Sequence, residues 1–295
     1  MDPSQLTCCE LTRYGRNMTN AVNTSPVWFV TGASSGIGRE LVRQALEAGE
    51  AVAAVARHAA ALGELGDADM LLTIDADVRD ETAVRKAVEQ TVARFGRIDV
   101  VANNAGYGLF GAVEEAADAQ ARAIFDTNVF GVLNVLRATL PVLRRQRSGH
   151  ILQGSSYFGQ TATPGVGLLA ATKYAVEGLS DALVAEVAPL GIKVTLIQPG
   201  MTATPFLSNL DTATATQADY DQTVRAVQQA IEALPTSAFS GVDRVAAGIR
   251  TAVASENPPL RLALGVAGAD HMRTALTTRI AELDEWAAVT KMVDA

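Results

Sequence analysis

A glycine-rich turn lies between the first apolar run of the chain and the first helical pattern. The residues that follow the run Val27–Thr31 and could surround a phosphate are Gly32, Ser34, Ser35, Gly36, Ile37 and Gly38. Glycine permits a tight turn and a close approach of the backbone, and the N–H groups that begin a helix attract an anion. A strand, such a turn and a helix in this order predict the pyrophosphate-binding turn of a dinucleotide site.

Arg57 directly follows the second apolar run, residues 51–56. In a site for NAD(H), an acidic residue usually accepts a hydrogen bond from the ribose 2′-hydroxyl at this point. The planar guanidinium of an arginine can instead pair with a 2′-phosphate. An exposed structural arginine is the alternative interpretation. The sequence therefore favours NADP(H) over NAD(H) as the cofactor.

Short apolar runs and longer helical patterns alternate along the chain and must position these residues. Strands are expected at residues 27–31, 51–56, 70–74, 98–102, 150–153, 193–198 and 260–264. Helices are expected at residues 37–48, 81–95, 119–145, with breaks near Gly131 and Pro141, and 170–188. Near-continuous apolar strands that alternate with helices predict an α/β fold with a doubly wound parallel sheet of Rossmann type in a single domain.

Composition restricts the partners of this domain. The 295 residues carry a formal net charge of −8, so neither nucleic acid nor a membrane surface is an expected partner. Cys8 and Cys9 are the only cysteines, which predicts a reducing, cytoplasmic location, and no metal site is expected. Residues 1–25 are polar and are interpreted as a flexible leader, with either Met1 or Met18 as the true start.

Residues 202–241 interrupt the alternation after the sixth apolar run. This segment is rich in Ala, Thr, Gln and Asp and contains few large apolar residues. Ligand crevices open at the carboxyl ends of parallel strands, so we expect the segment to be a lid or substrate loop of the domain formed by residues 26–295. A solvated surface insertion is the alternative.

The order of several motifs resembles the short-chain dehydrogenase/reductase superfamily from about Val27 to the C-terminus. The matching pieces are the glycine turn, Asp77-Val78, Asn103-Asn104-Ala105-Gly106, Asn128-Val129-Phe130-Gly131, Ser155-Ser156, Lys173 and Pro199-Gly200 with Thr204. The resemblance implies a Rossmann-type oxidoreductase that forms a homodimer or homotetramer through the helices at residues 119–145 and 170–188.

The resemblance also implies roles for individual residues. Asp77 and Val78 would contact the adenine, and Asn104, Ala105 and Gly106 would line the dinucleotide. Pro199, Gly200 and Thr204 would hold the nicotinamide amide. Ser156 would polarise a carbonyl, Lys173 would bind ribose and assist proton transfer, and Asn128 would support a proton relay.

One position departs from the pattern of this superfamily. The family has a tyrosine four residues before its lysine and thirteen after its serine, and both counts lead here to Leu169. Leucine has no group that can transfer a proton. Three interpretations stay open: a natural enzyme with another donor, a diverged enzyme that no longer transfers hydride, and an engineered Tyr-to-Leu variant of an ordinary ketoreductase. The candidate donors are Tyr157, Tyr107, Tyr174, a lysine-bound water and the substrate itself.

The function expected from these observations is that of an NADP(H)-dependent oxidoreductase with an atypical active site. Its substrate would be a small or medium apolar carbonyl, hydroxyl or polyketide-like compound, as in secondary metabolism. One alternative is a non-redox enzyme that catalyses a cyclisation, elimination, isomerisation or aldol-type step. Another is a non-catalytic NADP(H)-binding module.

Overall fold

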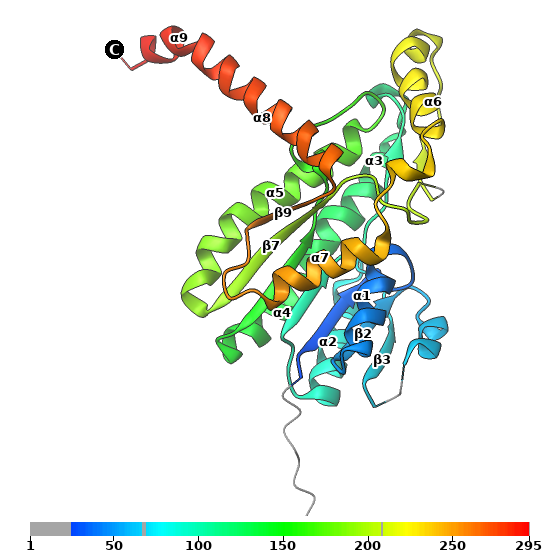
Figure 1. Ribbon diagram of the computed structural model, residues 1–295, viewed down its shortest axis with the longest axis vertical. Coiled ribbons are helices and arrows are strands. Elements are labelled where there is room, and N and C mark those ends of the chain that lie inside the picture. The colour runs from blue at the N-terminus through cyan, green and yellow to red at the C-terminus, as the bar shows by residue number, and fades with distance from the viewer. Residues whose placement is uncertain (1–24, 67–68, 208, 295) are drawn as a thin grey trace, which may run out of the picture.

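The computed structural model describes residues 25–66, 69–207 and 209–294. The expected leader at residues 1–25 therefore lies, except for Ser25, outside the described residues. The described chain folds around a parallel sheet with helices on both faces, and two further helices extend from the body at the C-terminal end (Figure 1).

The central sheet of the described chain has seven parallel strands in the order β3-β2-β1-β4-β6-β7-β9. The strands are β1 Val27–Thr31, β2 Ala51–Ala56, β3 Leu71–Asp75, β4 Val100–Asn103, β6 Gly149–Gly154, β7 Ile192–Pro199 and β9 Arg261–Leu264. Every residue of β1 and β2 is buried, as expected for strands that are covered on both faces. The order reverses between β1 and β4, and this is the point at which α/β sheets open a ligand crevice.

Two layers of helices cover the sheet. Helices α1 (Gly36–Glu47) and α7 (Val242–Ala254) pack on one face, where Leu41 and Ile249 join a single buried cluster. The other face is covered by α2 (Glu81–Phe95), α4 (Gly131–Gln146) and α5 (Gly167–Val187). This arrangement confirms the doubly wound, Rossmann-type single domain that the sequence predicts.

The helix expected at residues 119–145 differs from the prediction. It consists of α3 (Asp118–Phe125), a π-helical turn at Asp126–Phe130 and α4, so the irregularity precedes Gly131. The predicted break near Pro141 is wrong, because α4 continues through this residue. Val142 and Leu143 are buried in the core on its far side, and this packing outweighs the hydrogen bond that proline removes.

The remaining elements lie around the carboxyl edge of the sheet. They are β5 (Leu109–Phe110), β8 (Asp211–Thr212), α6 (Ala226–Glu232), α8 (Val266–Glu285) and α9 (Ala287–Met292), and the sequence did not predict them. Short 3₁₀ segments occupy Ala60–Leu65, Val113–Glu115, Tyr157–Gly159, Ala188–Leu190, Ala218–Tyr220 and Thr236–Ala238, and a second π turn occupies Asp221–Arg225. None of the helices in the described part is both long and apolar enough to cross a membrane.

Candidate active site

A cavity of about 910 Å³ opens at the carboxyl edge of the sheet, next to the reversal of strand order. What we call its polar side is lined by the glycine turn and the ends of β2, β4, β6 and β7, and what we call its apolar side is lined by α5 and by large side chains of the segment 202–241. All the residues predicted for the site line this cavity, except Gly38 and Asn128, which lie directly behind its wall, and the candidate donor Tyr174, whose exposed hydroxyl contacts Arg279 instead.

The glycine turn has no room for side chains at two positions. Gly32 has a φ of +64°, and a Cβ there would stand 2.8 Å from the Cα of Ala105. A Cβ on Gly38 would stand 2.4 Å from the carbonyl oxygen of Gly32 and 2.5 Å from Nδ2 of Asn104. The turn therefore packs directly on the loop after β4, and its backbone stays open toward the cavity.

Hydrogen bonds join the same two loops. The Thr31 hydroxyl accepts from the backbone N–H groups of Asn104 and Ala105, each at 3.1 Å. The Asn104 amide donates to the Thr31 carbonyl oxygen at 3.1 Å. Helix α1 begins beside this junction, and the hydroxyl of its N-cap residue, Ser35, makes no capping hydrogen bond. The first-turn N–H groups of α1 thus lie beside the cavity without a side-chain cap, as an anion site requires.

Arg57 is exposed at the end of β2 and lines the cavity together with Asp77 and Val78. The side chain of Asp77 accepts from Arg79 at 2.6 Å. This bond, with a smaller contribution from the charge of Arg57, holds the pKa of Asp77 below its ordinary value. The loops after β2 and β3 thus place Arg57, Asp77 and Arg79 together at one end of the cavity.

Asn128 and Lys173 meet behind Gly106. The Asn128 side-chain oxygen accepts from the Tyr107 N–H at 3.1 Å, and its amide donates to the Tyr107 carbonyl oxygen at 2.9 Å. Lys173 Nζ donates to the Gly154 carbonyl oxygen at 2.8 Å. A Cβ on Gly106 would stand 3.0 Å from Asn128 Oδ1 and 3.7 Å from Lys173 Nζ. The structure therefore brings these predicted residues together, and Asn128 uses its amide to fix the Tyr107 loop.

Ser156 lies at the end of β6 and begins the turn Tyr157–Gly159. Its hydroxyl accepts from the Phe158 N–H at 3.2 Å, so its own proton can be donated toward the cavity. The hydroxyl of the neighbouring Ser155 donates to Glu177 on α5 at 2.5 Å. The two adjacent serines therefore have different surroundings, and Ser156 is the one whose hydroxyl is not committed to a carboxylate.

Leu169 lies on α5 one turn before Lys173 and is only 3% exposed. It belongs to an apolar cluster with Tyr157, Phe158 and Val166. Residues four apart on a helix share a face, so this side of the cavity is apolar directly beside the Lys173 stem.

Burial shifts the pKa of three titratable groups that line the cavity. It lowers the pKa of Lys173 to about 8. It raises the pKa of Tyr157, whose hydroxyl donates to Met201 Sδ at 3.9 Å, to about 12. Burial also raises the pKa of Tyr107. Both phenols are thus weaker acids than a free tyrosine, while Lys173 titrates closer to neutrality.

The segment 202–241 supplies large apolar side chains to the cavity, although the sequence suggested few. Phe206, Leu207, Leu210 and Ile231 line it, beside Met201 at the end of β7. Met201, Leu210 and Ile231 could not be found from the sequence, because no local pattern distinguishes them from ordinary core residues.

Glu115 and Arg225 connect this segment to the body of the domain. Glu115 is 1% exposed, forms an ion pair with Arg225 and accepts from the Gln217 N–H at 2.7 Å. The hydrogen bond from Arg225 lowers the pKa of Glu115 to about 2. Among the described residues, no group of three or more His, Cys, Asp or Glu lies close enough together to hold a metal ion.

The sheet, the glycine turn and the cavity at the strand ends together define a Rossmann-type enzyme. Residues 26–215 match the family described as short chain dehydrogenase, and the chain belongs to this family of oxidoreductases. It is 37% identical over 239 residues to 3-ketodihydrosphingosine reductase of Bacteroides thetaiotaomicron, an alignment that covers 80% of this chain and 87% of that relative.

Solved structures show the same architecture. A short-chain dehydrogenase from Streptomyces avermitilis superposes with a TM-score of 0.84 at 37% identity, covering 91% of this chain and 100% of that one. The alcohol dehydrogenase of the archaeon Thermococcus sibiricus, complexed with 5-hydroxy-NADP, superposes with a TM-score of 0.66 at 25% identity, covering 81% of this chain and 96% of that one.

Proposed function

We propose that the protein is an NADP(H)-dependent oxidoreductase that interconverts a carbonyl and a hydroxyl group on an apolar small molecule. The observation that carries this proposal is one continuous cavity with two chemically different sides. Its polar side includes Arg57 and its apolar side includes Leu169, and Ser156 and Lys173 line the same cavity.

The residues on the polar side fit a phosphorylated dinucleotide. The glycine turn and the start of α1 would hold the pyrophosphate, and Arg57 would hold a 2′-phosphate. Asp77 and Val78 would border the adenine, Asn104 to Gly106 the dinucleotide, Lys173 the ribose, and Pro199, Gly200 and Thr204 the nicotinamide amide. When bound, the nicotinamide would supply or accept the hydride. The related archaeal alcohol dehydrogenase bound to an NADP derivative supports this assignment.

Two residues of this chain would handle the oxygen of the substrate. The Ser156 hydroxyl would donate a hydrogen bond to it and stabilise the developing charge. Lys173, with a pKa of about 8, would exchange the proton through a water held in the space beside Leu169. Tyr157 and Tyr107 fit the donor role less well, because burial raises the pKa of both phenols away from neutrality. Asn128 would act by holding the loop that carries Tyr107.

The apolar side favours a ketone or alcohol on a compound with few charges. Phe110, Val166, Leu169 and Leu210 offer hydrocarbon surface, which binds apolar groups by excluding water. The relative named 3-ketodihydrosphingosine reductase supports a keto compound as the substrate type.

A comparison of three proteins tests the proposal: the wild type, Leu169→Tyr and Leu169→Phe. NADPH oxidation would be followed with a panel of apolar ketones. We expect slow turnover in the wild type and a gain of about 10²- to 10⁴-fold in Leu169→Tyr, which restores a phenol beside Lys173. Leu169→Phe matches the ring without the hydroxyl and should show no gain. Absence of turnover in all three proteins, despite NADPH binding, would overturn the oxidoreductase assignment.

A further inference from the structure

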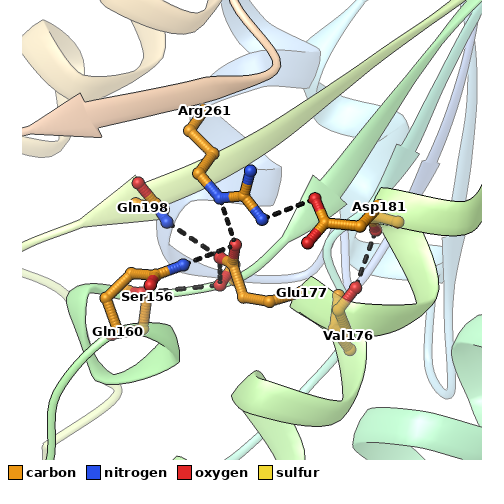
Figure 2. Close-up of polar contacts among 9 residues, drawn as sticks. Ser156, Gln160, Val176, Glu177, Asp181, Gln198 and Arg261 are labelled. Atoms are coloured by element: carbon orange, nitrogen blue, oxygen red, sulfur yellow. Dashed lines mark hydrogen bonds and ion pairs between the residues drawn. The ribbon is translucent and has the colours of Figure 1, made fainter. Parts of the chain in front are cut away.

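A buried carboxylate stands one helical turn beyond Lys173. Glu177 on α5 is 4% exposed, and Gln160, Gln198 and Arg261 converge on it in Figure 2. Its Oε1 accepts from the Ser155 hydroxyl at 2.5 Å and from the Gln198 amide at 2.9 Å. Its Oε2 accepts from the Gln160 amide at 3.0 Å and from Arg261 Nε at 2.8 Å.

These partners come from three separate segments, and two of these segments also contribute residues to the lining of the cavity. Ser155 and Gln160 flank the turn that begins at Ser156. Gln198 directly precedes Pro199 and Gly200 at the end of β7, and Arg261 is the first residue of β9. Glu177 itself lies on the helix that carries Lys173. The Glu177 carboxylate therefore connects three parts of the proposed site: the turn that begins at Ser156, the helix that carries Lys173, and the strand that leads to Pro199 and Gly200.

The packing around Glu177 leaves little room for adjustment. A Cβ on Gly159 would stand 2.6 Å from the Ser155 hydroxyl oxygen and 2.9 Å from both Cγ and Oε1 of Glu177. Arg261 is fixed from its other side by Asp181, which accepts from Nη2 at 2.6 Å (Figure 2). The turn at Ser156 is thus pressed against the carboxylate, and the cation that pairs with this carboxylate is itself held in place.

Replacing the buried Glu177 carboxylate should disturb the hydrogen bonds and the ion pair that surround it. A buried charge is tolerated when a counter-ion and hydrogen bonds satisfy it, and here the described residues supply both. If Glu177 is changed to Gln, one of its two acceptor oxygens becomes an NH2 donor, so hydrogen bonds on that side are lost and the attachment of the turn at Ser156 to α5 is weakened. Small displacements of a reacting group lower the rate far more than they lower affinity.

We propose that Glu177 is a positioning residue that fixes Ser156 relative to Lys173. This inference rests on the proposed oxidoreductase function for its effect on rate, but its structural part is independent of that function. Glu177 does not line the cavity, and it acts through Ser155 and the turn Tyr157–Gly159.

The test compares Glu177→Gln with Ser155→Ala and with the control Glu50→Gln, all in the Leu169→Tyr background. Glu50 also pairs with an arginine, Arg250, at 2.6 Å and accepts from Trp28 at 2.8 Å, but it does not line the cavity. We expect Glu177→Gln to lower kcat about 10- to 100-fold while KM for NADPH changes less than about twofold. Ser155→Ala keeps the ion pair and should lower kcat by a smaller factor, and Glu50→Gln should change neither constant.

Amide hydrogen exchange gives a second readout that needs no turnover. Exchange in residues 155–160 should rise about tenfold in Glu177→Gln and stay unchanged in Glu50→Gln. Unchanged exchange in this turn overturns the positioning role, whether or not any variant is active. Faster exchange with kcat within about twofold of its background also overturns it. If no protein turns over any ketone, the proposed function fails, and the exchange result alone decides whether Glu177 holds the turn.

Discussion

The two sides of the cavity are built in different ways. The polar side, called the cofactor side below because the proposed cofactor would bind there, is formed by short loops directly at strand ends. At Gly32 and Gly38 these loops leave no space for a side chain. The apolar side, called the substrate side below because the proposed substrate would bind there, is formed by α5 and by the segment 202–241. The Glu115–Arg225 ion pair joins this segment to the body of the domain, and the two residues are more than a hundred positions apart in the sequence. Close packing at the glycines leaves the backbone of the cofactor side little freedom. The substrate side depends on contacts between residues far apart in the sequence, so its shape and chemistry can vary more.

The largest effect should come from breaking the cofactor side sterically. Gly38→Ala places a Cβ 2.4 Å from the Gly32 carbonyl oxygen, so the turn must shift. We expect the dissociation constants of both NADPH and NADH to rise on the order of 100-fold, as measured by fluorescence titration. Gly178→Ala on α5 is the control, because a Cβ there meets nothing within 4 Å. Equal affinity in both variants would contradict the assignment of this turn.

A more selective change removes only the charge at the end of β2. Arg57→Ala should weaken NADPH binding about 20-fold and leave NADH binding within about twofold, because only NADPH carries a 2′-phosphate. Arg85→Ala on α2, which is exposed and does not line the cavity, should affect neither cofactor. Equal losses for NADPH and NADH in Arg57→Ala would refute the assignment of Arg57.

Lys173 lines the cavity on α5, and the pH dependence of kcat tests its proposed role as proton donor. With a pKa of about 8, the ammonium is present below pH 8 and is lost above it. In a reaction that needs a proton donor, kcat for ketone reduction should therefore fall about tenfold between pH 8.5 and 9.5, whereas alcohol oxidation, which needs the free amine, should rise up to about pH 8.5 and then level off. In Lys173→Arg the charge persists, so any residual activity should be flat there. A flat wild-type profile would exclude Lys173 as the titrating group.

The smallest effect should come from loosening the substrate side. Arg225→Gln removes the counter-charge of Glu115 and should raise KM for an apolar ketone about three- to fivefold, because the segment 202–241 becomes less ordered over the cavity. The dissociation constant of NADPH should not change. Arg122→Gln breaks an exposed ion pair with Asp118 and serves as the control. A loss of NADPH binding in Arg225→Gln would show that the two sides are not separable.

Sequence patterns predicted the central fold closely. The strands β1 and β2 and the helix α2 begin and end at the predicted residues, because each carries a clear apolar period and a defined boundary such as the Asp80 cap of α2. The patterns did not predict that α4 continues through Pro141, or that α6, α7, α8 and α9 form. Helix α4 continues through Pro141 because residues on both sides of this proline are packed in the core. Most side chains of α8 are exposed, so the sequence of this helix has no periodic apolar pattern that would predict it.

The site was predicted unevenly for a related reason. The glycine turn and Arg57 can be found from local order, since each directly follows an apolar run. Glu177 has no such signal. Its partners Ser155, Gln198 and Arg261 lie 22, 21 and 84 positions away.

The sequence by itself determined the alternating elements, the glycine turn and the four-residue spacing between Leu169 and Lys173. These features depend on neighbouring residues and on helix and strand periodicity, which act over short distances along the chain. Only the tertiary structure decided which groups lose contact with water. Burial lowers the pKa of Lys173 to about 8, raises that of Tyr157 to about 12 and places Glu177 behind Ser156. Water is excluded from these groups only when the sheet and the helices have packed together, because each element alone covers only part of a side chain. The pKa shifts therefore cannot be derived from local sequence.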